Sequence, residues 1–145
     1  MKRVPLYLTL LLACLGMYGL YGIYSDFLHN TWKGEFGRKF VGSGVKLRVL
    51  QEDCHFVYCS YLVDLNEVDL EKCIRKDRLL EVTASPKVWD IQRVKDRIKS
   101  RGVVDFDVDA PTVRLFAPAP IGPKNSVAYD TASHHAVVSM DGSMN

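Results

Sequence analysis

The sequence lacks the motifs that mark the common classes of enzyme active site. No serine lies in a G-x-S-x-G motif, and neither H-E-x-x-H nor C-x-x-C-H occurs. Gly42 to Gly44 is a bare G-x-G without the third glycine of a nucleotide-binding loop. The histidines are His29, His55, His134 and His135, and only the last two are adjacent. These absences argue against an enzyme, and the sequence assigns no catalytic or cofactor-binding residue.

The chain also lacks a surplus of either charge. Its 19 lysines and arginines nearly balance 17 aspartates and glutamates, which gives a net charge of +2. A nucleic-acid-binding domain needs a strongly basic face, so nucleic acid is not an expected partner. Asp105, Asp107 and Asp109 alternate as on one face of a strand, but the glycine and terminal glutamate of an EF-hand loop are missing. They are therefore interpreted as a solvated strand edge, and no metal or other cofactor is expected.

Cysteines are few, and their spacing is not that of a zinc site. Cys54 and Cys59 fit a C-x2–4-C pair only loosely, and Cys73 alone lies further on. An odd number outside the N-terminal region permits one disulfide plus a thiol, or no disulfide. Cys54 and Cys59 would point to opposite faces of one regular strand, so their pairing requires a turn or bulge between them. A disulfide among these three cysteines is therefore left open.

Against these absences stands one long apolar run. No charged residue occurs from Val4 to Tyr24, and Lys2 and Arg3 precede the run. As a helix rising about 1.5 Å per residue, the run reaches roughly 30 Å, the thickness of the hydrocarbon core of a bilayer. Pro5 falls in the first turn, where its missing N–H costs nothing. Residues 1–25 are therefore predicted to form a transmembrane anchor.

Two processed forms are alternatives to an uncleaved anchor. A signal peptide has a shorter apolar region and a small-residue cleavage site, whereas this run is longer and has no A-x-A pattern. Leu11 to Cys14 resembles the lipobox of bacterial lipoproteins, in which the cysteine becomes the lipidated N-terminus. The residues after Cys14 remain apolar, however, where a mature lipoprotein usually continues with a polar tether. The uncleaved anchor is the favoured interpretation.

Small residues recur at every third position of the anchor and would let another helix approach closely. This predicted helix-packing row consists of Ala13, Gly16, Gly19 and Gly22. Its alternative explanation is that glycine is simply common in membrane helices.

Aromatic and basic residues at the ends of the anchor favour the headgroup layer of a membrane, anionic lipids included. The predicted interfacial residues are Tyr7, Tyr21, Tyr24, Trp32, Lys33, Arg38 and Lys39. Residues 26–44, which are mixed and interrupted by glycines, are predicted to form an interfacial connector. An ordinary polar connector is the alternative.

Residues 45–116 carry the signals of one small α+β domain. Runs of β-forming residues predict strands at 45–50, 55–63, 79–83, 103–108 and 112–116. A short helix is expected at 66–78 with Asn66 as its N-cap. A second helix is expected at 86–101, where Ser85 caps the start and Gly102 ends it.

The helix predicted at 86–101 carries a basic outer face. Its cations are Lys87, Arg93, Lys95, Arg97, Lys99 and Arg101. Such a face can meet anionic headgroups or an acidic partner. A charged helix face that is merely solvated is the alternative interpretation.

Residues 117–145 change in character, with several prolines, many small residues and few large apolar ones. A segment of this composition lacks the burial needed to fold alone. It is therefore predicted to be an extended tail that wraps a neighbouring subunit.

Residues 4–40 combine a hydrophobic helix with Pro5, Leu6, Cys14 and Gly16, a boundary with Tyr24 and His29, and the basic-aromatic stretch KGEFGRKF. On these residues the N-terminal part resembles the MWFE-type accessory subunit of mitochondrial respiratory complex I. The resemblance implies a single-pass subunit without catalytic residues, held in the inner membrane by its helix.

The expected function is therefore a non-catalytic accessory subunit of a large membrane complex, most simply of the mitochondrial respiratory chain. Its partners would be other subunits and the lipid bilayer. Lys2 and Arg3 would stay on the inner side, which places the domain in the intermembrane space. The alternative is a bacterial envelope protein, membrane-anchored or lipidated, with a periplasmic binding domain.

Overall fold

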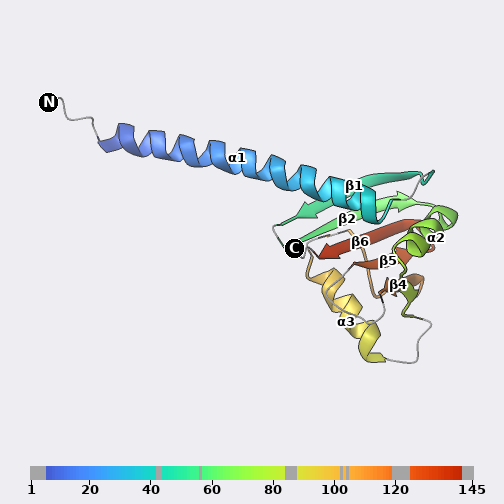
Figure 1. The fold of residues 1–145 in the computed structure, drawn as a ribbon. Helices are drawn as coiled ribbons and strands as arrows, with labels where there is room; N and C mark the ends of the chain where they lie inside the picture. Colours follow the sequence, from blue (N-terminus) through green and yellow to red (C-terminus); the bar gives the residue numbers. More distant parts are fainter. Residues whose placement is uncertain are drawn as a thin grey trace.

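The chain forms a long helix that runs directly into an antiparallel sheet covered by helices, as Figure 1 shows. The computed structural model describes residues 6–41, 44–55, 57–83, 88–101, 103, 105–118 and 125–141. The elements in chain order are α1 (Leu6–Lys39), β1 (Leu47–Cys54), β2 (Tyr58–Leu65), α2 (Glu67–Lys76), β3 (Leu80–Glu81), α3 (Val88–Lys99), β4 (Val113–Ala117), β5 (Ser126–Asp130) and β6 (His135–Asp141). This confirms the expected α+β class with a long apolar N-terminal helix.

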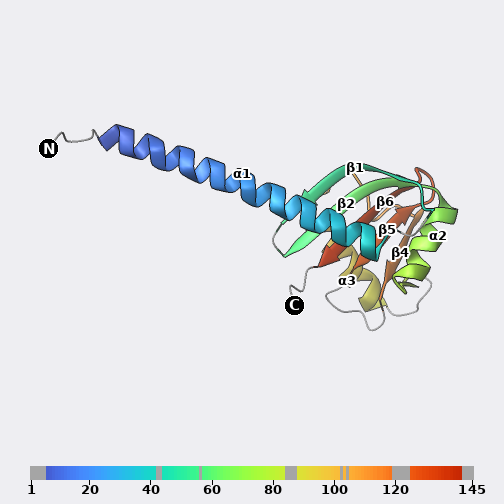
Figure 2. The same ribbon diagram turned by 45° about the horizontal axis from the view of Figure 1, so that its top comes forward.

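The six strands form one sheet in the order β1-β2-β6-β5-β4-β3, and all neighbours are antiparallel. Successive side chains of a strand point to opposite faces, so the sheet has two apolar faces. One face packs against the C-terminal part of α1 and against α2, with Phe40 and Leu70 fully buried. The other packs against α3 through Val94 and Ile98. Figure 2 shows α1 crossing the strands β1 and β2 on its own side of the sheet.

Helix α1 has two halves that share one backbone. Every described side chain from Tyr7 to Phe27 is exposed, and the helix is long and apolar enough to be a candidate membrane span. From Leu28 onward a stripe of residues at four-residue spacing turns into the domain. Leu28, Trp32, Phe36 and Phe40 are buried there against the sheet.

The connector predicted at residues 26–44 is therefore mostly helix, because α1 continues to Lys39. Glycine weakens a helix by about 1 kcal/mol relative to alanine, and two glycines, Gly34 and Gly37, lie in the helical portion of this segment. Burial of the aromatic stripe outweighs that cost, since each buried aromatic side chain contributes roughly 1.5–3 kcal/mol. Trp32, predicted at the membrane interface, is instead in the domain core with 5% of its surface exposed.

The extended tail predicted at residues 117–145 is wrong for most of its length. Strands β5 and β6 come from this segment and lie in the interior of the sheet order. Small residues such as Ser126, Ala128 and Ala136 occur there because both faces of these strands are covered, and all three are fully buried. Residues 119–124 and 142–145 lie outside the described residues.

A tight turn joins β5 to β6 and is organised by one carboxylate. Asp130 accepts hydrogen bonds from the Ser133 hydroxyl at 2.6 Å and from the Ala132 amide at 3.1 Å. Hydrogen bonds from Ser133 and Thr112 are the main reason that the pKa of Asp130 falls to about 2. His134 closes the turn in the left-handed backbone region, at φ 59°. These hydrogen bonds stabilise the turn that places β5 beside β6.

Among the other elements predicted from the sequence, some are confirmed and one is wrong. Asn66 caps α2 as predicted, its side-chain oxygen accepting the Asp69 amide at 2.8 Å. The helix expected at 86–101 is present as α3, while its expected cap, Ser85, lies outside the described residues. The strand expected at 103–108 is not formed by its described residues, where Asp107 accepts the Asp109 amide at 3.0 Å in a turn.

Replacing Phe36 with alanine should destabilise the domain strongly. Phe36 is 5% exposed and its ring stacks on Tyr61 with centroids 4.3 Å apart, so its loss leaves a cavity in the core. We expect the free energy of unfolding to fall by about 3 to 5 kcal/mol. The measurement is denaturant unfolding of the full chain in detergent, followed by tryptophan fluorescence.

The matched control is Phe27→Ala in the same helix, where the phenylalanine is 62% exposed. A change of less than about 0.5 kcal/mol is expected there. Equal losses for the two variants would contradict the division of α1 into exposed and buried halves.

Candidate functional site

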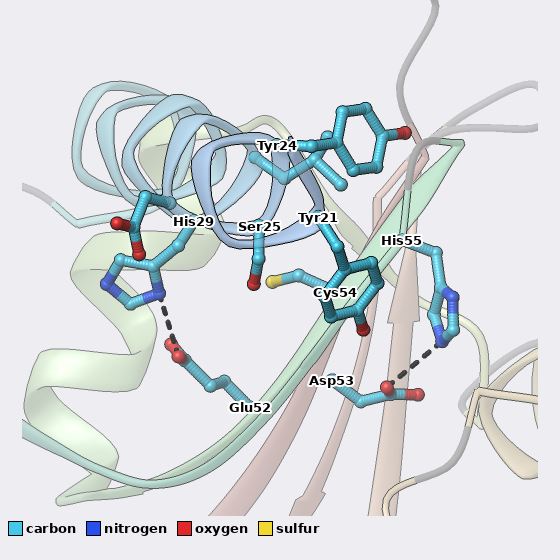
Figure 3. A pocket seen from close by; sticks show the side chains of 10 residues that line it. Tyr21, Tyr24, Ser25, His29, Glu52, Asp53, Cys54 and His55 are labelled. Atoms are coloured by element: carbon cyan, nitrogen blue, oxygen red, sulfur yellow. Dashed lines mark ion pairs between the residues drawn. The ribbon is translucent and has the colours of Figure 1, made fainter. Parts of the chain in front are cut away.

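A polar groove lies where α1 leaves the domain. It has a volume of about 580 Å³ and is lined by residues of α1 between Tyr21 and His29 and by Glu52 to His55 at the end of β1. Figure 3 shows the side chains of Tyr21, Ser25 and His29 directed from the helix toward this end of β1. The groove exists because β1, the edge strand of the sheet, runs beside the helix.

Two imidazole–carboxylate pairs line the groove. His29 Nδ1 lies 2.8 Å from a Glu52 carboxylate oxygen and joins the helix to β1. His55 Nε2 lies 3.1 Å from an Asp53 carboxylate oxygen at the tip of the hairpin. The indole N–H of Trp32 donates to the His55 carbonyl oxygen at 2.8 Å. The contacts made by His29 and Trp32 hold the β1–β2 hairpin against the helix, and the Asp53–His55 pair lies within the hairpin.

A disulfide between Cys54 and Cys59 closes the same hairpin. The two residues are direct partners in the β1–β2 register, with Cα atoms 4.0 Å apart, so the turn that their pairing required is present. Cys73 is buried in the core between α2 and the sheet and takes no part in this disulfide. The Tyr61 hydroxyl lies 3.8 Å from Cys54 Sγ, and burial, aided by Glu52, raises its pKa to about 12. Tyr61 is therefore protonated throughout the neutral range.

Carboxylate, imidazole and phenol groups supply the polar chemistry of this groove. Among the described residues, no group of three or more histidine, cysteine, aspartate or glutamate side chains is arranged to hold a metal ion. Its carboxylates, Asp26, Glu52 and Asp53, have no lysine or arginine beside them among the described lining residues. The lining thus combines negative charge with imidazole and phenol groups.

The predicted helix-packing row lies on an open surface. Ala13, Gly16, Gly19 and Gly22 are all exposed. A Cβ atom added at any of the three glycines would meet nothing within 4 Å. The row is therefore open to another helix as far as the described part of the chain shows.

Most of the predicted interfacial residues are exposed, but Trp32 is not. Tyr7, Tyr21 and Tyr24 are exposed on α1 at 73%, 70% and 44%. Lys33 is exposed, and the exposed Arg38 pairs with Glu35. The side chain of Lys39 lies outside the described residues, and Trp32 is buried as described above.

Four cations of the predicted basic face form ion pairs with two carboxylates of the same domain. Lys95 and Lys99 bind Asp109 at 3.1 and 2.5 Å. Hydrogen bonds from Lys99 and then Lys95 lower the pKa of Asp109. Arg97 and Arg101 flank Asp141 at 3.9 and 2.5 Å. Arg93 is exposed and Lys87 lies outside the described residues. Four of the six predicted cations are therefore engaged within the domain.

A row of serines that the sequence did not single out lies beneath α3. Ser60, Ser139 and Ser126 are adjacent in the register of β2, β6 and β5, and all are fully buried. Arg97 donates to the Ser126 hydroxyl oxygen at 3.0 Å, and the guanidinium of Arg101 lies 4.1 Å from the ring centre of Tyr58. The sequence could have indicated these serines through two signals taken together: side chains alternate between the two faces of a strand, and a basic helix was available to cover one face.

No protein-family model, curated protein or solved structure matched this chain. The candidate site is therefore defined by its own geometry: the groove, its imidazole–carboxylate pairs and the disulfide-closed hairpin.

The cysteine pairing can be checked by counting thiols. After denaturation without reductant, two cysteines, Cys14 and Cys73, should react with an alkylating reagent, because Cys54 and Cys59 are joined. With reductant, all four cysteines should react. Intact-mass spectrometry reads both numbers, and four reactive thiols before reduction would refute the pairing.

Replacing Asp141 with asparagine should destabilise the domain. Asp141, Arg97 and Arg101 have side chains only 13%, 14% and 18% exposed, so loss of the carboxylate leaves two cations poorly compensated. We expect a loss of about 2 to 3 kcal/mol in the free energy of unfolding. Glu71→Gln is the control, since its pair with Arg75 is exposed and contributes about 0.5 kcal/mol or less.

Thermal and denaturant unfolding of the two variants make this comparison. If Asp141→Asn costs no more than Glu71→Gln, the cations of α3 do not depend on Asp141.

Proposed function

We propose that this chain is a single-pass membrane protein that acts as a non-catalytic accessory subunit of a large membrane complex. The observation that carries the proposal is the construction of α1. Its N-terminal half is exposed and apolar, and its C-terminal half is part of the domain core. An apolar helix surface of this size is stable in lipid and unfavourable in water.

The continuity of α1 fits an adaptor better than a tethered enzyme. A flexible linker would let a domain search for substrates, whereas a helix rooted in the core holds its domain in one orientation at the membrane surface. The open row from Ala13 to Gly22 then offers a packing surface for a neighbouring transmembrane helix. Orientation and helix packing together are the properties that an accessory subunit needs.

The compartment we propose for the domain is an oxidising one. A disulfide such as Cys54–Cys59 persists in oxidising compartments, of which the periplasm is one, and is rare in the reducing cytosol. Lys2 and Arg3 precede the apolar run, and Lys33, Arg38 and Lys39 follow it, so basic residues flank both ends and the disulfide carries the proposed orientation. The resemblance of residues 4–40 to the MWFE-type subunit favours the mitochondrial inner membrane, with the domain in the intermembrane space. The bacterial envelope is the competing location, because the same disulfide suits a periplasmic domain.

Native electrophoresis of the epitope-tagged full chain from its own cells tests the proposal. After mild detergent extraction we expect migration within a respiratory complex of megadalton size. Migration as a small species of its own would contradict the accessory role and favour the envelope protein.

A substitution in the small-residue row sharpens this test. Gly19→Leu should weaken co-migration, because it fills the surface where a helix would approach. Met17→Phe adds bulk at an exposed position outside the row and should leave co-migration intact. Equal behaviour of the two variants would contradict packing through the row.

A further inference from the structure

We infer that the groove between α1 and the β1–β2 hairpin binds the headgroup of a phospholipid, and that it prefers a headgroup bearing an amine. The inference rests on the proposed function, since it requires α1 to cross a membrane. It adds a ligand class and a site that the accessory role does not by itself imply.

The height of the groove along α1 is the first reason. The uncharged run ends at Tyr24, and Asp26 is the first charged residue after it. The groove is lined by α1 residues on both sides of this boundary, from Tyr21 to His29. Helical rise places Ser25 to His29 within about 6 Å along the axis, and each headgroup layer is roughly 5 to 8 Å thick. In the proposed orientation the groove therefore opens into the headgroup layer.

The groove is also a preformed space. Its volume of about 580 Å³ falls within the usual range of small-molecule sites, roughly 300 to 1,000 Å³. The His29–Glu52 pair and the bond from Trp32 to the His55 carbonyl hold its two walls together. The disulfide restrains the hairpin tip that forms one wall. A ligand therefore pays little to order the site.

The charge of the lining selects the headgroup. Asp26, Glu52 and Asp53 line the groove, where Glu52 contacts His29 and Asp53 contacts His55, and no lysine or arginine is present among its described lining residues. The ammonium group of a zwitterionic headgroup gains from these carboxylates, whereas phosphatidylglycerol brings its phosphate charge without an ammonium group to offset the repulsion.

Aromatic rings supply the second contact with an ammonium group. Figure 3 shows the side chain of Tyr21 extending from α1 toward the end of β1, where Cys54 lies. Tyrosine faces attract cations within about 6 Å of the ring centre. The acyl chains of a lipid held here would lie along the exposed apolar surface of α1 below Tyr21. The headgroup and the acyl chains would thus each contact a surface of matching polarity.

The test is lipid retention by the full chain. The protein is reconstituted in nanodiscs containing equal parts of phosphatidylethanolamine, phosphatidylcholine and phosphatidylglycerol, then released into the gas phase for native mass spectrometry. We expect one retained lipid, with each amine-bearing lipid enriched about tenfold over phosphatidylglycerol, which corresponds to roughly 1.4 kcal/mol.

Two variants and two controls locate the site. Glu52→Gln with Asp53→Asn, and separately Tyr21→Leu, should each reduce the enrichment at least about threefold. The control Asp64→Asn with Glu71→Gln removes the same charge away from the groove, and Tyr18→Leu removes an equally exposed tyrosine of α1. These controls should retain lipid as the unaltered protein does. Far-ultraviolet circular dichroism and melting temperature confirm that the variants are folded.

Three outcomes would overturn the inference: equal retention of phosphatidylglycerol, equal loss in variants and controls, or binding of soluble phosphoethanolamine in detergent as tightly as the lipid. Failure of the proposed function is seen separately. A chain that carbonate extracts from membranes does not span them, whereas an integral chain that shows no lipid preference contradicts only the groove.

Discussion

The packing of one aromatic stripe against the sheet is the constraint on which the rest of the structure depends. Leu28, Trp32, Phe36 and Phe40 follow one another at one turn of helix and are buried against β-strand residues such as Tyr61. Because the stripe belongs to the same helix as the exposed apolar half, it leaves no room for a flexible linker. The direction of α1 is thereby set by the domain core, and the edge strand β1 is brought beside the helix to form the groove.

Local signals in the sequence predict some elements of this fold and miss others. The apolar run, the Asn66-capped helix and the helix α3 follow from composition, periodicity and capping, and the last two are found close to their expected bounds. These local signals did not predict the extension of α1 through Gly34, nor did they predict the central strands β5 and β6. In both cases burial against distant segments outweighs weak local preference, because strands covered on both faces accept alanine and serine.

The candidate site depends even more on contacts between distant residues. Tyr21 and Tyr24 were expected at a membrane interface, and they line the groove that lies there in the proposed orientation. Their neighbours Glu52 and His55 come from a hairpin whose register no short motif specifies. The basic helix illustrates the opposite error, since four of its predicted cations pair with Asp109 or Asp141, which lie elsewhere in the sequence. A charged helix face is therefore weak evidence for a partner until its intramolecular ion pairs are known.

The central claim is that α1 is a single rigid rod, half in the membrane and half in the domain core. Amide hydrogen exchange of the full chain in nanodiscs tests it most directly, because exchange reports local opening at each backbone amide. The account predicts slow exchange without interruption from the apolar half through Ser25 and His29 to Phe36. A run of rapidly exchanging amides between Ser25 and Trp32 would mark a flexible linker and contradict the account.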